Sequence, residues 1–133
     1  MSNIIEIIRS LPKFSGYKKP SSIEISDAEI QLGLRFADEY KEYLAEFGEA
    51  SAKGIALTGI IDADYINVVS ATKEKWGLYP QIPHNMYVIE DATIDGIIIW
   101  QDGEGIIYKS TPRTDAVKIA DSLTEYLTER FEM

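Results

Sequence analysis

Few side chains in this sequence are of the types that catalyse reactions by nucleophilic attack. His84 is the only histidine, and the chain has no cysteine. Any Ser–His–Asp arrangement would therefore need His84, which lies in the segment IPHNM, after Pro83 and before a predicted strand. The G-x-S-x-G turn that exposes a nucleophilic serine does not occur. We interpret His84 as a loop or strand-edge residue, and we expect that the protein is not an enzyme.

Carboxylates are the only abundant metal-ligating groups in the chain. Two pairs, Asp62 with Asp64 and Asp91 with Asp95, could supply oxygen ligands to a calcium ion. However, the D-x-D-x-D-G-x5-E pattern of a calcium loop is missing, and a single histidine without cysteine excludes the usual zinc ligand sets. No phosphate-binding loop is present either. The sequence therefore predicts neither a metal site nor a cofactor.

Acidic residues are concentrated in one half of the chain. The formal net charge is −9, and residues 54–108 carry eight acidic and two basic side chains, which places −6 of that charge in this stretch. Nucleic-acid binding needs a basic face, so the balance argues against DNA or RNA as a partner. An acidic region attracts basic partners and speeds association with them. The alternative, that the charges serve only solubility, stays open at this point.

The acidic stretch also contains aromatic residues, which favours recognition of a protein surface. They are Tyr65, Trp76, Tyr79, Tyr87, Trp100 and Tyr108. Aromatic side chains beside carboxylates can anchor an Arg- or Lys-rich partner, although burial in the core is the alternative and is favoured for Trp100. The candidate partner-binding residues are Asp62, Asp64, Tyr79, Glu90, Asp91 and Asp95. We expect their carboxylates to be exposed on one surface, with Asp102 on a different rim.

Composition is typical of a soluble globular protein. The 133 residues fit one domain, 1–133, with a sizeable core. No apolar run approaches the ~20 residues of a membrane span, and the N-terminal MSNIIEIIRS lacks the basic start of a signal peptide. The absence of cysteine fits a reducing cytoplasm. We therefore expect a cytoplasmic protein with no membrane partner, and the oligomeric state is left open.

The elements that must position these residues are organised around a set of antiparallel strands. Met86–Ile89 and Ile97–Trp100 are short runs of β-forming residues. Glu90–Gly96 is expected to be a polar turn between them, and residues 102–105 to form the next hairpin turn before a strand at Ile106–Tyr108. Four consecutive large apolar residues need cover on both faces, so Ile97–Trp100 is expected to be a buried central strand.

Helices and loops are expected to cover these strands. Apolar periodicity, caps and breakers predict helices at Asn3–Leu11, from Ser26 to about Gly33, at Ala37–Phe47 and at Tyr65–Trp76, loops at 14–22 and 49–54, and a strand at Ile55–Ile61. A capping box of Ser26 and Glu29 opens the second helix, and Asp62 or Asp64 caps the fourth. In the third helix Glu39 is expected to face solvent, and Gly48 is expected to follow it with a positive φ.

The chain after Tyr108 allows two interpretations. Thr111-Pro112 could open one helix that runs to Phe131. Alternatively, Val117–Ile119 is an edge strand, and Asp121 or Ser122 starts a shorter helix that ends near Phe131.

Three short motifs occur in the order found in a known family. Leu32-Gly33-Leu34 and the later Asp38, Tyr40 and Leu44 match an LGxxLPxDYxxFL pattern, and Ala120, Ser122, Leu123 and Leu127 match a terminal A-x-S-F-x-x-F-L helix. On these residues the chain resembles the SMI1/KNR4 family of the SUKH superfamily over residues 23–130. Two departures are that the family's Leu-Pro is Phe36-Ala37 here and that its Asn-Gly-Gly loop is replaced by residues 48–51.

The resemblance implies an α+β fold, a single domain with an antiparallel-rich sheet packed by several helices. It also selects the edge strand and the shorter helix after Tyr108. Known members look non-catalytic, and many bacterial ones look like immunity proteins that neutralise toxins of polymorphic or contact-dependent systems. We therefore expect a non-catalytic immunity protein whose partner is a basic toxin domain. A regulatory adaptor that binds a cellular protein is the alternative, and a small-molecule or metal-dependent enzyme is the remaining one.

Overall fold

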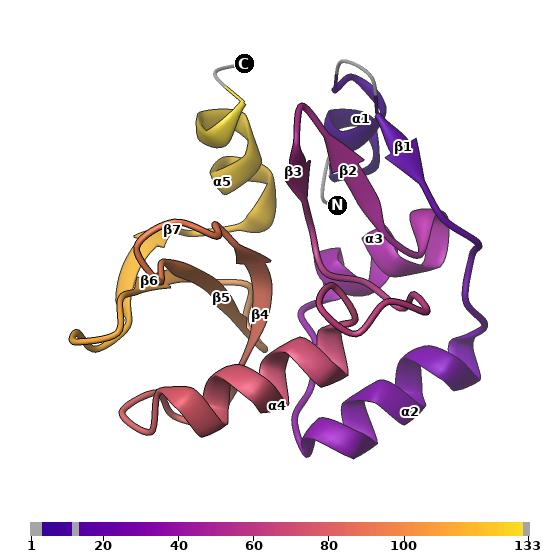
Figure 1. The fold of residues 1–133 in the computed structure, drawn as a ribbon. Helices are drawn as coiled ribbons and strands as arrows, with labels where there is room; N and C mark the ends of the chain where they lie inside the picture. Colours follow the sequence, from indigo (N-terminus) through magenta and orange to yellow (C-terminus); the bar gives the residue numbers. More distant parts are fainter. Residues whose placement is uncertain (1–3, 12–13, 132–133) are drawn as a thin grey trace.

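The structure is a computed structural model of the chain, and it describes residues 4–11 and 14–131. Within those residues the fold is α+β, with five helices and two antiparallel sheets (Figure 1). In chain order the elements are α1 (Ile4–Arg9), β1 (Ser15–Gly16), α2 (Ser22–Leu32), α3 (Asp38–Phe47), β2 (Ala50–Ala52), β3 (Ile55–Ala56), α4 (Val68–Leu78), β4 (Met86–Asp91), β5 (Ile98–Asp102), β6 (Ile107–Ser110), β7 (Val117–Ala120) and α5 (Leu123–Arg130).

The larger sheet has the order β4-β5-β6-β7, and every neighbouring pair is antiparallel. Alternate residues point to opposite faces of a strand, so Ile89 and Ile99 join the core that α3 and α5 cover. Val88 and Trp100 join a second cluster with Ala71 of α4. The helices therefore cover both faces of β5, which is the central strand predicted from the sequence.

The limits of β4, β5 and β6 differ from the predicted ones by one or two residues. Ile98 and Ile99 are buried in β5, but Ile97 precedes the strand and is only half-buried. Glu90 and Asp91 were expected in a polar turn and instead extend β4, where they pair with Ile99 and Ile98. Pairing with β5 satisfies their backbone groups, so the strand continues past the apolar run.

The smaller sheet, in the order β1-β2-β3, was not predicted. Its strands are two or three residues long. β1 and β2 lie where loops were expected, and β3 is the first part, Ile55–Ala56, of the strand predicted at 55–61. Gly48 has the expected positive φ, 72°. Its carbonyl accepts the Ile60 N–H at 2.8 Å, and a Cβ on Gly59 would lie 2.1 Å from that oxygen. Two backbone segments thus cross where only glycine fits.

Helix starts also differ from the prediction. Ser21 and Glu24 form the capping box that opens α2, so the box expected at Ser26 is wrong, because Ser26 lies inside the helix. Asn67 caps α4 through its side-chain oxygen, which accepts the N–H groups of the second and third residues beyond it, and neither Asp62 nor Asp64 does so. The cap expected at Asn3 lies outside the described residues.

The chain after Tyr108 follows the second interpretation. Val117–Ala120 forms β7 at the edge of the larger sheet. Ser122 then caps α5 by accepting the Glu125 N–H at 3.0 Å. α5 lies near α1, on the side of the larger sheet away from α4 (Figure 1).

Candidate partner-binding surface

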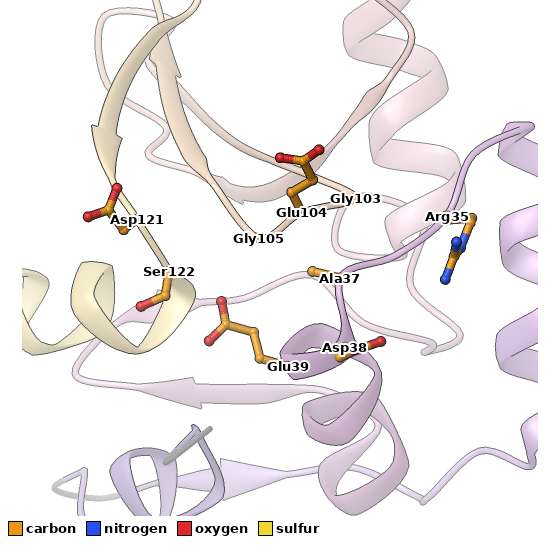
Figure 2. A pocket seen from close by; sticks show the side chains of 9 residues that line it. All are labelled: Arg35, Ala37, Asp38, Glu39, Gly103, Glu104, Gly105, Asp121 and Ser122. Carbon is orange, nitrogen blue, oxygen red and sulfur yellow. The ribbon is translucent and has the colours of Figure 1, made fainter. Parts of the chain in front are cut away.

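Two hollows in the surface lie at the two ends of α5. The N-terminal hollow, about 730 Å³, is lined by Arg35, Ala37, Asp38, Glu39, Gly103, Glu104, Gly105, Asp121 and Ser122 (Figure 2). The C-terminal hollow, about 400 Å³, is lined by Gly54, Ile55, Ala56, Thr58, Tyr65, Ile66, Glu90, Asp91, Ala92, Thr93 and Arg130. With eight residues, α5 separates them by about 12 Å.

Glu39 forms the inner wall of the N-terminal hollow. It was expected to face solvent, but it is only 8% exposed. Its carboxylate accepts the Gln101 Nε2–H at 2.9 Å and the backbone N–H groups of Leu123 and Thr124, with a fourth contact from the Thr124 hydroxyl at 3.3 Å. The first amides of a helix have no partner within the helix and attract a negative charge. Glu39 is therefore buried because it satisfies the start of α5.

The other charged groups around this hollow are mostly acidic. Figure 2 shows the carboxylates of Asp38, Glu104 and Asp121 around the opening, with Arg35 on one side. Asp121 forms an ion pair with Lys118, whereas no ion pair within residues 4–11 and 14–131 reaches Asp38 or Glu104. These residues come from three separate segments, and sequence reasoning did not bring them together.

Glu90 lies at the inner end of the C-terminal hollow. Its expected exposure is wrong, since the residue is only 2% exposed. One carboxylate oxygen accepts the Tyr126 hydroxyl, and the other accepts Arg130 Nη2 at 3.1 Å. Burial and the neighbouring Glu90 charge raise the pKa of Tyr126 well above its ordinary value, so it stays a hydrogen-bond donor. Glu90 thus holds the far end of α5 and is not available to a partner.

The other candidate residues divide into exposed and supporting side chains. Asp62, Asp64 and Asp95 are exposed as expected, and no ion pair within the described part of the chain reaches them. Asp91 is half-buried; it pairs with Lys75 at 3.2 Å and accepts the Thr93 N–H at 2.8 Å. Tyr79 is half-buried against the cluster around Trp100. Asp91 and Tyr79 therefore make contacts mainly within the protein and are less accessible to a partner than the three exposed aspartates.

Two exposed apolar side chains in the same region were not among the candidate partner-binding residues. Tyr65, expected at the start of a helix, precedes α4 and is 77% exposed, the most exposed aromatic side chain of the described residues. Ile94, in the turn between β4 and β5, is 60% exposed. The segment with Tyr65 and the segment that ends at Thr93 line one hollow. We call Asp62, Asp64, Tyr65, Ile94 and Asp95 the Tyr65 face.

The segments on either side of this hollow are not joined by strand pairing. Strands 55–61 and 97–100 would have brought them together by running antiparallel, but β3 and β5 lie in different sheets. The contact is made instead by Thr58, whose N–H donates to Ile89 O of β4 at 2.8 Å and whose hydroxyl donates to Val88 O at 2.7 Å. A side-chain hydroxyl therefore joins the two sheets at this edge.

His84 lines a third hollow, of about 510 Å³, together with Asp102 and Tyr108. Its ring is exposed and stacks on Trp76, with 4.1 Å between the ring centroids. The Tyr108 hydroxyl donates to Asp102 at 2.9 Å, but no hydrogen bond within the described residues joins His84 to either group. In the part of the chain that the structure describes, no three His, Asp or Glu side chains are grouped to hold a metal ion.

None of the helices in the described ranges is long and apolar enough to cross a bilayer.

Comparison with models of known protein families gives a match. The model of the family SUKH_5, described as SMI1-KNR4 cell-wall, matches residues 1–132, which is nearly the whole chain. No curated protein matches the sequence. The family match agrees with the α+β fold and with the order of motifs in the sequence.

Proposed function

Given that this chain belongs to the SMI1/KNR4 family of the SUKH superfamily, we propose that it is a cytoplasmic, non-enzymatic protein that binds and neutralises a toxin. The toxin is one of a polymorphic or contact-dependent system and presents a basic surface. Binding covers the toxin's working surface, and opposite charges speed the encounter.

The observation that carries this proposal is the composition of the Tyr65 face. Tyrosine is enriched at the centres of protein interfaces. Here the exposed Tyr65 follows Asp62 and Asp64 in the chain, and the exposed Ile94 precedes Asp95. No ion pair within the described residues reaches these three aspartates. Carboxylates without an internal partner lose little when they exchange water for an arginine or lysine of another protein.

The test takes as partner a toxin domain sought among the genes beside the gene for this protein, and it measures association with that domain. A triple variant, Asp62→Asn, Asp64→Asn and Asp95→Asn, removes three charges and keeps the side-chain shapes. Asparagine also tolerates the positive φ of 54° at Asp95. We expect the association rate constant to fall at least tenfold at low salt and its salt dependence to flatten.

The matched control removes three charges elsewhere: Asp38→Asn, Glu104→Gln and Asp115→Asn. All three residues are exposed, so the net charge of the control equals that of the triple variant. We expect the control to retain most of the association rate and to protect cells that express the toxin. Equal rates for the two variants would mean that the charge acts as a whole and not through the Tyr65 face. No protection by the unaltered protein would refute toxin neutralisation.

A regulatory adaptor is the second candidate, favoured by the reference to the cell wall in the description of the family. An adaptor would bind an ordinary cellular protein through the same face and leave toxicity unchanged. Association measured with purified proteins, alongside the growth assay, separates the two functions.

A further inference from the structure

We propose that the C-terminal hollow receives one apolar side chain of the partner, flanked in the partner's sequence by lysine or arginine residues on both sides. This proposal rests on the proposed function, because it specifies what the Tyr65 face binds. It follows from the different charge of the floor and the rim of the hollow.

The floor of the hollow has no unused charge. Glu90 is satisfied by Tyr126 and Arg130, and both of its oxygens accept a hydrogen bond. A lysine that entered would have to displace Arg130, and a carboxylate that entered would lie against Glu90. Asp91, which also lines the hollow, is paired with Lys75. About half of the lining surface is apolar, and Ile55, Ala56 and Ile66 contribute to it. A neutral apolar side chain is therefore the group that fits.

Exposed aspartates lie close in the chain to both sides of the hollow, and we take them as its rim. Tyr65 lines one side and follows Asp64 directly and Asp62 by three residues, and Asp95 is two residues beyond Thr93, which lines the other side. The volume of about 400 Å³ lies within the roughly 300–1,000 Å³ typical of small-ligand pockets, so it can hold an aromatic side chain. Basic residues on either side of that side chain would then reach the aspartates.

Both sides of the rim are held in place before a partner binds. In the β4–β5 turn, Ala92 N–H donates to Ile97 O at 3.1 Å, and Ile97 N–H donates to Ile94 O at 3.0 Å. On the other side, Asn67 Nδ2 donates to Ile61 O at 3.1 Å. A preformed rim reduces the conformational entropy lost on binding.

The experiment uses three capped peptides as probes: Lys-Lys-Phe-Lys-Lys, Lys-Lys-Ala-Lys-Lys and Glu-Glu-Phe-Glu-Glu. Each is titrated into the full-length ¹⁵N-labelled protein, and amide chemical shifts are followed. We expect the first peptide to shift the amides of Tyr65, Ile66, Thr93 and Ile94. It should bind at least fivefold more tightly than the alanine peptide, because phenylalanine removes more apolar surface from water. The glutamate peptide should cause no shifts there.

Two variants locate the binding site. Tyr65→Ala should weaken binding of the phenylalanine peptide at least threefold. Tyr17→Ala, which removes another exposed tyrosine, should leave its affinity unchanged. The proposal is overturned if the phenylalanine and alanine peptides bind equally, if no peptide binds, or if the shifts cluster around Asp38 and Glu104. These peptide results do not depend on the growth assay, so failure of toxin neutralisation and failure of this proposal are separate outcomes.

Discussion

The two ends of α5 are each held by a buried glutamate, but by different chemistry. At the N-terminal end, Glu39 accepts hydrogen bonds from neutral donors, among them the backbone N–H groups of Leu123 and Thr124. At the C-terminal end, Glu90 accepts hydrogen bonds from the Tyr126 hydroxyl and the Arg130 guanidinium. Both glutamates belong to acidic segments of the sequence, and both were expected to face water.

The helix dipole explains why the two ends differ. The N-terminus of a helix carries partial positive charge, so a carboxylate there is stabilised without a cation. The C-terminus carries partial negative charge, so a buried carboxylate near it needs a positive partner. Arg130, the last residue of α5, supplies that partner. The hydrogen bond with Glu90 raises the pKa of the Arg130 guanidinium above its ordinary value. The two positions therefore tolerate different substitutions.

The largest effect is expected for Glu39→Gln. The glutamine amide has one acceptor oxygen in place of two, and its NH₂ group would face the N–H donors of Leu123, Thr124 or Gln101. We expect the free energy of unfolding to fall by about 3 kcal/mol, because buried donors lose a charged acceptor. Urea unfolding at neutral pH measures this value. A loss below about 1 kcal/mol would contradict the role given to Glu39.

A smaller effect, about 1–2 kcal/mol, is expected for Glu90→Gln. The glutamine oxygen can still accept from Tyr126, and the Arg130 side chain, which is 38% exposed, can turn to water. In a double-mutant cycle, Arg130→Met should destabilise the unaltered protein more than it destabilises the Glu90→Gln variant. If Glu90→Gln lowers the free energy of unfolding as much as Glu39→Gln does, the helix dipole does not explain the difference between the two ends of α5.

Sequence reasoning succeeded where a structure depends on local pattern. The hairpin of β5 and β6 and the helix α3 follow from runs of β-forming residues, periodicity and caps within a few positions. The succession of β7 and α5 was one of two interpretations that the local pattern allowed, and the family resemblance selected it. The smaller sheet was not predicted, because its strands are short and contain five alanine and serine residues but only one β-former, Ile55. Helix starts were displaced because several polar residues in a row could each serve as the cap.

The site was harder to predict because its key contacts are distant in sequence. Glu39 and Leu123 are 84 positions apart, and Glu90 and Tyr126 are 36 apart. Nothing in the neighbouring residues distinguishes these glutamates from exposed ones, since both lie beside a second acidic residue. The exposure of Asp62, Asp64 and Asp95 was predicted, because turn aspartates face water by default. The exposure of Tyr65 was not predicted, because the helix was expected to begin at Tyr65 and α4 begins three residues later.

A third buried glutamate extends the comparison to a carboxylate without donors. Glu49 is buried, and no hydrogen bond within the described residues reaches its carboxyl group. Burial raises the pKa of Glu49 from 4.5 to about 7. The folded state therefore binds this proton more tightly than the unfolded state does. The stability it contributes is complete below about pH 4.5 and is lost as the pH rises through 7.

We expect this loss to be on the order of 1–2 kcal/mol, less than the full shift implies, because the carboxyl oxygens keep some contact with solvent. Thermal unfolding between pH 4.5 and 8 measures it, and Glu49→Gln, which cannot titrate, should flatten that slope. If the variant and the unaltered protein show parallel slopes over this range, the Glu49 carboxyl is not the titrating group.

The smallest loss of stability is expected for substitution of Asp38, the residue that precedes Glu39. Asp38 precedes Glu39 in the first turn of α3, but it is exposed and forms no ion pair with any described residue. Asp38→Asn removes a charge near a helix N-terminus, where an exposed carboxylate contributes a few tenths of a kcal/mol that salt screens. We expect a loss of at most about 0.5 kcal/mol in urea unfolding, and less in 0.5 M salt. A larger loss would show that the Asp38 carboxylate stabilises the fold, as the Glu39 carboxylate does, and that it is not a free surface charge.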